Sequence, residues 1–381
     1  MEVRRLAKKI FAAIGRYIKK LDKILLLMCL ACSAISLILL KTMYDSDMPR
    51  VYSRTLKVQI LAVCIGVVVA IIVSLFDYHF LAKLWKLHLP ISIALVALTF
   101  FIGLGRAGAD DRAWINLPMG LTLQPSEILK LSFILSFALH LENVRDKINS
   151  PLTLLTLGVH AAIPVVLVRL QGDDGTMLIF IFIIVSMLFA AGLSWKYLVG
   201  GIVAIGAASP LIWKYVLTAD QRARFAITYN LESDPLGQGY QQLEGLTAIG
   251  RGSVLGKGFA QESYWWTPEI HNDFIFAFAG EVLGLVGAIG IIVLLFGISV
   301  KLIISAVKAK DGLGAYICIG ICAMFTFQTI LNIGMCLSVL PVIGVTLPLI
   351  SAGGTSVVTM YAGLGLALGV HSHREKSMFD R

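Results

Sequence analysis

The sequence predicts an all-α, polytopic integral membrane protein with about ten transmembrane helices. Hydrophobic residues make up 57% of the 381 positions and charged residues only 14%, whereas an average soluble domain has roughly 25% charged residues. Apolar runs long enough to cross a bilayer, which takes about 20 helical residues, recur along the whole chain. Backbone polar groups in lipid must be satisfied within each segment or in a closed barrel, so these runs are expected to form one helical bundle.

Residues 1-23 are predicted to form a basic amphipathic helix on the cytoplasmic membrane surface. Apolar side chains recur there at helical spacing between many Lys and Arg side chains, a pattern that favours an anionic lipid leaflet. A cleaved signal peptide is the competing interpretation, but the basic part is too long and no small-residue cleavage site follows it. The net charge of +9 lies mainly at the ends of the predicted spans, which argues against a nucleic-acid partner.

Residues 24-371 are expected to form a single transmembrane domain in the bilayer. When the basic N-terminus is placed inside, Lys and Arg are more frequent in cytoplasmic than in external segments, so both termini are predicted to be cytoplasmic, including the tail at 372-381. Residues 217-273 then form one large extracellular loop between helices 7 and 8, too long to be a mere connector. The predicted spans are 24-44, 57-76, 88-105, 125-141, 152-169, 176-192, 195-216, 274-300, 313-337 and 351-371.

A polar external segment precedes the fourth predicted span. That span begins with Pro125, and Pro is favoured at the first helical position because its missing N–H costs nothing there. Glu127 and Lys130 are three residues apart and therefore share a helix face. They form either a structural ion pair that faces the bundle or a pair beside the phosphates of a substrate. Arg112 fits an interfacial anchor or a substrate contact.

Two adjacent aspartates, Asp173 and Asp174, lie between predicted spans in the sequence RLQGDDGTM. A solvated turn is the simpler interpretation. The alternative is a site for a metal or a sugar hydroxyl. If a divalent cation such as Mg²⁺ or Mn²⁺ takes part, this pair or Asp273 would supply ligands, although no spacing in the sequence demands a cofactor.

The large external segment combines cationic side chains with glycines. Arg222, Arg224 and Lys257 are candidates to contact an anionic substrate. The glycines of GRGSVLGKG either expose backbone N–H groups to an anion or only permit turns.

Two acidic residues, Asp273 and Glu281, flank the start of the eighth predicted span. Asp273 immediately precedes the helix, where it fits an N-cap, and a carboxylate at the membrane surface is also well placed to receive a proton. Glu281 lies two turns further on, among apolar residues. A carboxylate at membrane depth costs roughly 2.5 to 3.5 kcal/mol, so Glu281 should face the protein interior or a wet cavity.

The last external stretch, residues 337-361, is rich in Pro and Gly and carries no charge. Non-helical backbone at this depth must be buried in protein or line a cavity. Its small residues include Ser351, Gly353 and Gly354. They either allow close helix approach or leave room for a bulky glycan-lipid.

The polar segments follow one another in a characteristic order: AWI, LQPSEILK, QGDDGT, GYQQLEGLTAIGRGSVLGKG, HNDFIFAFAGE, NIGM and LPVIGVTLPLISAGGTS. This order closely resembles that of the RodA/FtsW/SpoVE family, also called SEDS, of bacterial cell shape, elongation, division and sporulation proteins, over essentially the whole chain. NIGM and PVIGVTLPLISAGG look more like the RodA branch, which acts in elongation.

The resemblance implies a peptidoglycan glycosyltransferase that polymerises lipid II at the outer face of the bacterial cytoplasmic membrane. Its implied partners are a class B penicillin-binding protein, which crosslinks the product, and other membrane proteins of the elongation machinery. By position, Asp273 matches the family's aspartate considered essential for catalysis. Glu127 and Lys130 match the charged pair in QPSExxK. Arg112 matches the arginine that precedes the family's Trp.

This chain departs from the family pattern in two places. Val282 follows Glu281, whereas the family often has paired glutamates, and this puts any role of a second carboxylate in doubt. SAGG stands where SYGG is usual, a change that a packing motif should tolerate.

The family's reaction needs one general base and groups that stabilise a departing diphosphate, because a single inverting displacement converts an α-linked donor into a β-1,4 glycan. Asp273 would take the proton from the acceptor's sugar hydroxyl. The competing functional classes are a lipid II flippase or transporter and a non-enzymatic membrane scaffold of the cell-wall machinery. The cations that could offset the leaving group's charge are Arg112, Lys130, Arg222, Arg224 and Lys257.

Overall fold

The computed structural model describes residues 20–46, 52–105, 112–117, 122–237 and 239–373. Within them the chain is almost entirely helical, and the two short strands pair antiparallel, so the predicted all-α class is confirmed. The helices of the bundle and its arch are α2 (Lys23–Asp45), α3 (Tyr52–Leu75), α4 (Tyr78–Lys83), α5 (Trp85–Ile102), α6 (Pro125–Val144), α7 (Pro151–Leu170), α8 (Asp174–Ala190), α9 (Trp195–Leu211), α12 (Ile275–Val307), α13 (Gly312–Cys336) and α14 (Gly354–Ser372). The other elements are β1 (Ile115–Asn116), β2 (Thr122–Leu123), the 3₁₀-helices η2 (Arg145–Lys147) and η4 (Leu231–Ser233), the π-helix η3 (Ile212–Val216), α10 (Ala219–Thr228) and α11 (Tyr240–Gly252).

A helix lies at each of the predicted spans, and the chain is a multi-pass membrane protein. Seven of the described helices are long and apolar enough to cross a bilayer. The helix α8 is strongly apolar but has only 17 residues. The helix α6 carries Glu127, Lys130 and Glu142, and α14 intersperses its apolar residues with small and polar ones. Most residues of these two helices are covered by neighbouring helices, so their polar side chains do not face lipid.

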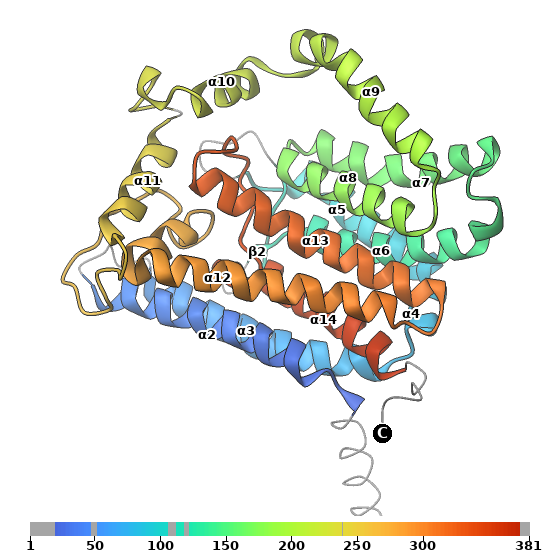
Figure 1. Cartoon of the computed structure of the whole chain (residues 1–381), viewed down its shortest axis with the longest axis horizontal. Helices are drawn as coiled ribbons and strands as arrows, with labels where there is room; N and C mark the ends of the chain where they lie inside the picture. The colour runs from blue at the N-terminus through green and yellow to red at the C-terminus, as the bar shows by residue number, and fades with distance from the viewer. Residues whose placement is uncertain (1–19, 47–51, 106–111, 118–121, 238, 374–381) are drawn as a thin grey trace, which may run out of the picture.

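The helices α3 and α14 pack closely along their length because glycines let the backbones approach. A Cβ atom added to Gly66 of α3 would lie 2.6 Å from Cδ2 of Tyr361, and one added to Gly365 of α14 would lie 2.6 Å from the carbonyl oxygen of Ala70. Small residues at helix contacts serve this purpose in membranes, where no hydrophobic force drives helices together. Figure 1 shows α2, α3, α12 and α14 side by side.

The long helix α12 is interrupted at Gly284, whose φ of 67° and ψ of −171° are not helical. The segment 253–258 lies against this interruption. N–H groups of Leu285 and Val286 donate to the carbonyl oxygens of Ser253 and Val254 at 3.0 and 3.2 Å. The remaining 23 residues, at about 1.5 Å each, still suffice to span a bilayer. The first two turns of α12 are therefore enclosed by protein.

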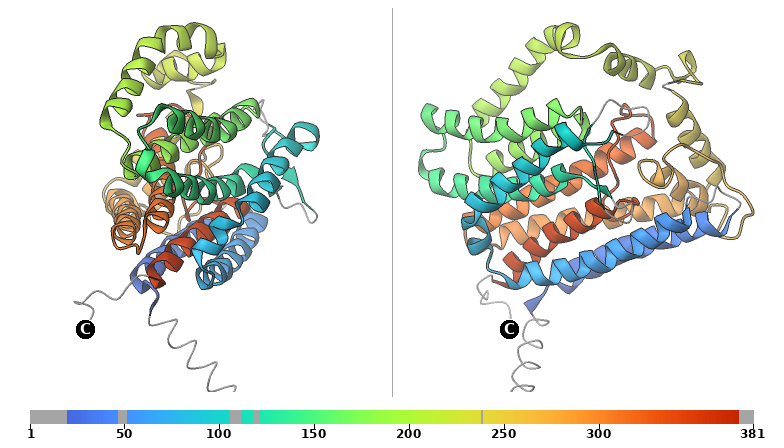
Figure 2. Two further views of the ribbon diagram at one scale, coloured as in Figure 1. Left: turned by 90° about the vertical axis from the view of Figure 1, so that its right-hand side faces the viewer. Right: turned by 180° about the vertical axis from the view of Figure 1, so that it is seen from behind.

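The predicted loop at 217-273 is not an unstructured connector, because it contains α10, η4 and α11. Together with α9 it forms an arch that leaves the bundle and returns to it at α12 (Figures 1 and 2). No residue of the apolar span Trp195–Val216 is buried within the described structure.

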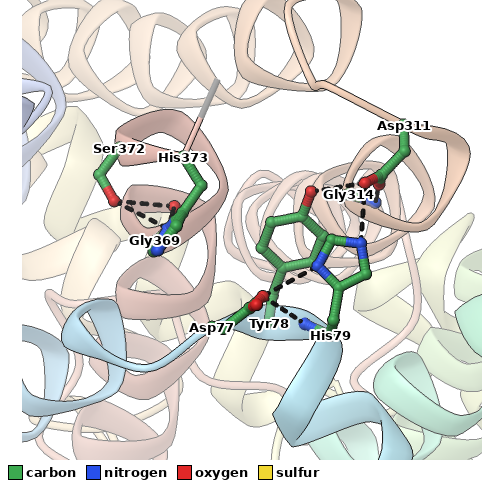
Figure 3. Close-up of polar contacts among 8 residues, drawn as sticks. All are labelled: Asp77, Tyr78, His79, Asp311, Gly314, Gly369, Ser372 and His373. Carbon is green, nitrogen blue, oxygen red and sulfur yellow. Dashed lines mark hydrogen bonds and ion pairs between the residues drawn. The ribbon is translucent and has the colours of Figure 1, made fainter. Parts of the chain in front are cut away.

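The bundle end away from Asp273 is held by polar side chains around Asp311 (Figure 3). The hydroxyl of Tyr78 donates to Asp311 Oδ2 at 2.8 Å, and His79 Nε2 lies 2.9 Å from the same oxygen. Asp311 Oδ1 accepts the N–H of Gly314 at 2.8 Å and so caps α13. The 25 residues of α13 separate this cluster from the other end of the helix by roughly 37 Å.

Most of the predicted basic helix at 1-23 and most of the tail at 372-381 lie outside the described residues. Just before α2, Asp22 caps that helix by accepting the N–H of Leu25 at 3.1 Å. Lys301 of α12 lies 2.6 Å from its other carboxylate oxygen and ties the start of the bundle to α12.

Candidate functional site

Asp273 lies in the turn that joins the segment 217–273 to α12, and it is only 7% exposed. Its backbone carbonyl accepts hydrogen bonds from Asn332 Nδ2 at 2.8 Å and from Cys336 Sγ at 3.5 Å, both on α13. The N-cap position of α12 is occupied by Phe274, and no side chain caps the helix there. The interpretation of Asp273 as an N-cap is therefore wrong. Helix capping therefore does not explain why Asp273 is buried.

The turn that carries Asp273 is joined to the helix-free segment 337–353. Ser351 accepts the N–H of Leu347 at 2.7 Å and donates its hydroxyl proton to the carbonyl of Asn272 at 2.6 Å. The N–H of Ala352 donates to the carbonyl of His271 at 2.9 Å. Two consecutive residues of SAGG thus hold the two residues that precede Asp273.

Gln59 of α3 fixes the other side of SAGG. Its Nε2 donates to Ser36 Oγ at 3.0 Å and to the carbonyl of Ser351 at 3.1 Å, and its Oε1 accepts the N–H of Gly353 at 3.2 Å. All its polar atoms have partners, as a buried amide requires. Gln59 was not predicted from the sequence as a residue of the site. The only available signal was an isolated amide within an apolar run.

Gly353 and Gly354 do not serve close helix packing. A Cβ atom on Gly353 would lie 3.5 Å from Ser356 Cβ, and one on Gly354 would lie 3.6 Å from Val58 Cγ1, which are ordinary contact distances. The close-approach interpretation is wrong at these two positions.

Two more buried amides hold the helix-free segment. Gln242 of α11 donates through Nε2 to the carbonyls of Leu340 at 2.8 Å and Met335 at 3.3 Å. Asn332 donates to the carbonyl of Val345 at 2.7 Å as well as to that of Asp273. Neither amide was singled out from the sequence. Their role depends on which chain segments meet, and one-dimensional spacing does not contain that information.

Glu127 and Lys130 form the predicted pair on one face of α6. Lys130 Nζ lies 2.9 Å from Glu127 Oε1, and both side chains are buried. Within the described residues, Glu127 Oε2 has no hydrogen-bond partner. A buried carboxylate oxygen without a donor is costly, which fits a group that binds something more than the neighbouring ammonium.

The aspartate pair at the start of α8 is a helix cap rather than a solvated turn. Asp173 is buried and accepts the N–H of Thr176 and the Nε2 of Gln124, each at 2.9 Å. Asp174 pairs with Arg169 at 2.8 Å. In the described part of the chain, no three His, Cys, Asp or Glu side chains gather as a metal site would need.

Glu281 is completely buried and does not contact lipid. Its Oε1 lies 3.1 Å from Arg251 Nε and 3.0 Å from Lys257 Nζ, and its Oε2 accepts the N–H of Trp265 at 2.9 Å. Arg251 also lies over the Trp265 ring, 4.8 Å from its centroid. The arrangement ties the segment 217–273 to α12 and places Lys257 in an ion pair.

The glycine-rich stretch GRGSVLGKG does not cradle an anion. The N–H groups of Lys257 and Gly258 donate to the carbonyls of Glu281 and Val282 at 2.9 and 3.0 Å, and that of Gly256 donates to Gly252 at 2.8 Å. Gly256 has a φ of 78°, and a Cβ there would lie 2.2 Å from the Val282 carbonyl oxygen. Glycine is needed for turns and close approach, so the anion interpretation is wrong.

The other predicted cations are not gathered at Asp273. Arg112 is exposed, and its N–H donates to the carbonyl of Gln171 at 3.2 Å beside the β1–β2 hairpin. Arg222 and Arg224 lie on α10, in the arch seen in Figure 1, and Arg224 pairs with Asp220 at 2.9 Å.

His271 is the titratable neighbour of Asp273 in the turn. Burial lowers the pKa of this imidazole below its ordinary value of 6.5, while the Glu269 carboxylate acts in the opposite direction. The imidazole is therefore neutral near pH 7.

Comparison with known proteins assigns the chain to one family of bacterial proteins. Residues 19–376 match the model of the FtsW/RodA/SpoVE family, described as cell cycle proteins. The chain is 33% identical over 297 residues to the peptidoglycan glycosyltransferase MrdB of Escherichia coli K12, covering 76% of this chain and 79% of that protein. It is 32% identical over 324 residues to stage V sporulation protein E of Bacillus subtilis, covering 82% and 86%.

Solved structures agree with these matches. A chain from a peptidoglycan synthase complex, described as coordinating polymerisation and crosslinking, superposes with a TM-score of 0.78 at 28% identity, covering 94% of this chain and 99% of that one. The rod shape determining protein RodA of Thermus thermophilus superposes with a TM-score of 0.69 at 26% identity, covering 94% and 98%.

Proposed function

Because this chain belongs to the FtsW/RodA/SpoVE family, we propose that it is a peptidoglycan glycosyltransferase that polymerises lipid II at the outer face of the bacterial cytoplasmic membrane. We assign it to cell elongation, the role of the RodA branch that NIGM and PVIGVTLPLISAGG most resemble. One observation carries the proposal: Asp273 is buried at one end of the bundle, in a turn held by α13 and by the helix-free segment 337–353.

In this proposal Asp273 is the general base of an inverting transfer. Its carboxylate takes the proton of the acceptor's sugar hydroxyl while the hydroxyl oxygen attacks the donor sugar carbon and the undecaprenyl diphosphate departs. General bases contribute about 10² to 10⁴ in rate when they are positioned within hydrogen-bond reach. SAGG lies beside the turn, since Ser351 and Ala352 bond the carbonyls of Asn272 and His271.

The departing diphosphate needs positive charge. We propose that Lys130 supplies it, because its ammonium group is a buried cation close to the start of α6, held there by Glu127 at 2.9 Å. Arg112, which is exposed, is free to contact the same group from the membrane surface. Arg222 and Arg224 lie on α10, whose Gln221 contacts Asp174 of α8, and they would take part only if α10 brings them to the diphosphate. Lys257 would take part only if it leaves Glu281.

A divalent cation fits this site only together with the substrate. The described residues offer no group of three ligands, but Mg²⁺ is commonly held by one or two carboxylates plus substrate phosphates. Asp273 would be the carboxylate beside such an ion, whose chemistry would be to neutralise the diphosphate.

The partner we propose is a class B penicillin-binding protein in the same membrane, alongside other membrane proteins of the elongation machinery. The similarity to a subunit of a synthase complex supports a protein partner. Both termini are proposed to be cytoplasmic, which puts residues 217–273 and the Asp273 turn outside.

The proposed activity is tested with purified protein in detergent or liposomes supplied with lipid II, with and without a cognate class B penicillin-binding protein. Formation of glycan strands sensitive to a muramidase is the expected result. A flippase would instead move lipid II across liposomes without polymerising it, and a scaffold would do neither.

A further inference from the structure

Asn332 of α13 occupies a position that the proposed mechanism has not used. It is completely buried, and its Nδ2 carries the two protons that meet the carbonyls of Asp273 and Val345 at 2.8 and 2.7 Å. Both acceptors are carbonyl oxygens. This fixes the orientation of the amide, because a flipped amide would place Asn332 Oδ1 beside these two oxygens. Neither acceptor belongs to α13.

This one side chain therefore ties three segments together. The segments are the turn before α12, the helix-free stretch 337–353, and α13, which is anchored within the bundle. Removing the amide would leave two buried carbonyls with fewer donors, and a buried polar group that loses its partner destabilises the arrangement around it. Cys336, one turn later, offers the Asp273 carbonyl only a weak thiol donor at 3.5 Å.

The bond to Asp273 is made at the backbone of the residue that carries the proposed base. A shift of that carbonyl moves the attached Cα, and with it the carboxylate. The bond to Val345 holds the helix-free segment that includes SAGG. A misplacement of about 1 Å at a reacting group can reduce a rate by roughly 10².

We propose that Asn332 is a positioning residue that sets the place of the Asp273 carboxylate relative to the 337–353 segment. This inference rests on the proposed function, in which Asp273 is the general base. Asn332 does not touch the reacting atoms in this scheme, so it should influence the rate of the chemical step more than the binding of lipid II.

The test compares Asn332→Leu, which keeps the volume and removes both donors, with Thr329→Val on the same helix. Thr329 donates its hydroxyl only to the Phe325 carbonyl within α13, at 2.9 Å, so this control removes a donor without touching the turn. Each variant is purified, its folded fraction is measured by size exclusion and thermal unfolding, and kcat and KM for lipid II are determined. We expect kcat of folded Asn332→Leu to fall by about 10- to 100-fold, with KM changed less than about threefold, and Thr329→Val to resemble the parent.

Unchanged kcat in folded Asn332→Leu would overturn the inference, as would a rise in KM alone. If Asn332→Leu does not fold, Asn332→Ser, whose hydroxyl keeps one donor, is measured in the same way. Failure of both to fold would assign the residue to folding and overturn positioning. Asp273→Asn, run in parallel, separates the two proposals: if it stays active the general-base assignment fails, and if it is inactive while Asn332→Leu is normal only the positioning inference fails.

Discussion

Lys130 Nζ lies 2.9 Å from Glu127 Oε1 on one face of α6, and both side chains are buried. Removing one member of a buried pair leaves an uncompensated charge, at a cost of about 3–5 kcal/mol, whereas removing both can cost much less. We expect Glu127→Gln and Lys130→Met each to destabilise the protein more than the double variant does. The coupling free energy in a double-mutant cycle should be about 1–3 kcal/mol, measured by thermal or denaturant unfolding in detergent. Additive effects would show that the two charges do not interact.

Glu281 is expected to stabilise the fold through its contacts with Arg251, Lys257 and Trp265. Glu281→Gln keeps an acceptor for the Trp265 N–H but loses the charge that holds both cations. Because those cations reach solvent, we expect a loss of about 1–3 kcal/mol in unfolding free energy rather than collapse of the fold.

The control for Glu281 is Glu262→Gln, a change of the same kind at an exposed position of the same segment. The control should leave stability within about 0.5 kcal/mol. A Glu281→Gln protein of normal stability with a raised KM for lipid II would instead support a direct substrate contact.

The pH dependence of stability should include a contribution from His271. The pKa of its imidazole is lowered in the folded protein, mainly by burial, so the unfolded chain binds the proton more readily than the folded chain does. Stability from this group is therefore complete above its ordinary pKa of 6.5 and decreases as the pH falls below that value. Thermal unfolding from pH 8 to pH 5.5 should show a smaller acid slope for His271→Asn. Equal slopes for the two proteins would contradict the prediction.

The membrane orientation is predicted by the basic N-terminal segment and remains to be measured. Single cysteines placed at Ser233 and Ser377 in a background without the native cysteines should react differently with a membrane-impermeant thiol reagent added to intact cells. We expect labelling at position 233 and none at position 377 until the cells are opened. The reverse pattern would invert the topology and place Asp273 inside.

The helices were predictable because long apolar runs leave the backbone few alternatives in lipid. The contacts of the site were less accessible from sequence. Spacing along one helix placed Glu127 beside Lys130, but no spacing relates Gln59 to Ser351, which meet only because α3 and the helix-free segment converge. Likewise, Glu281 could be recognised as requiring a protected environment, but its partner Lys257 lies in a distant turn.

Asp273→Asn is predicted to abolish glycan polymerisation, with a loss of at least about 10²-fold in kcat, because an amide cannot accept the acceptor's proton. Expression, membrane insertion and association with the penicillin-binding protein should stay near normal. The structure supports this separation in two ways. Asn has the size of Asp, and the bond to Asn332 is made by the backbone carbonyl, which the substitution keeps. The helix α12 has no side-chain cap at its start, so no cap is lost.

The measurement is lipid II polymerisation by the purified variant beside the parent protein and Glu262→Gln, a control at an exposed acidic residue of the same segment, 217–273. The control should retain the parent's rate. The kcat of the parent should fall at low pH because the general base is then protonated. Any residual activity of Asp273→Asn should not show this fall. Full polymerase activity in folded Asp273→Asn would remove the general-base assignment, because the reaction would then proceed without the carboxylate.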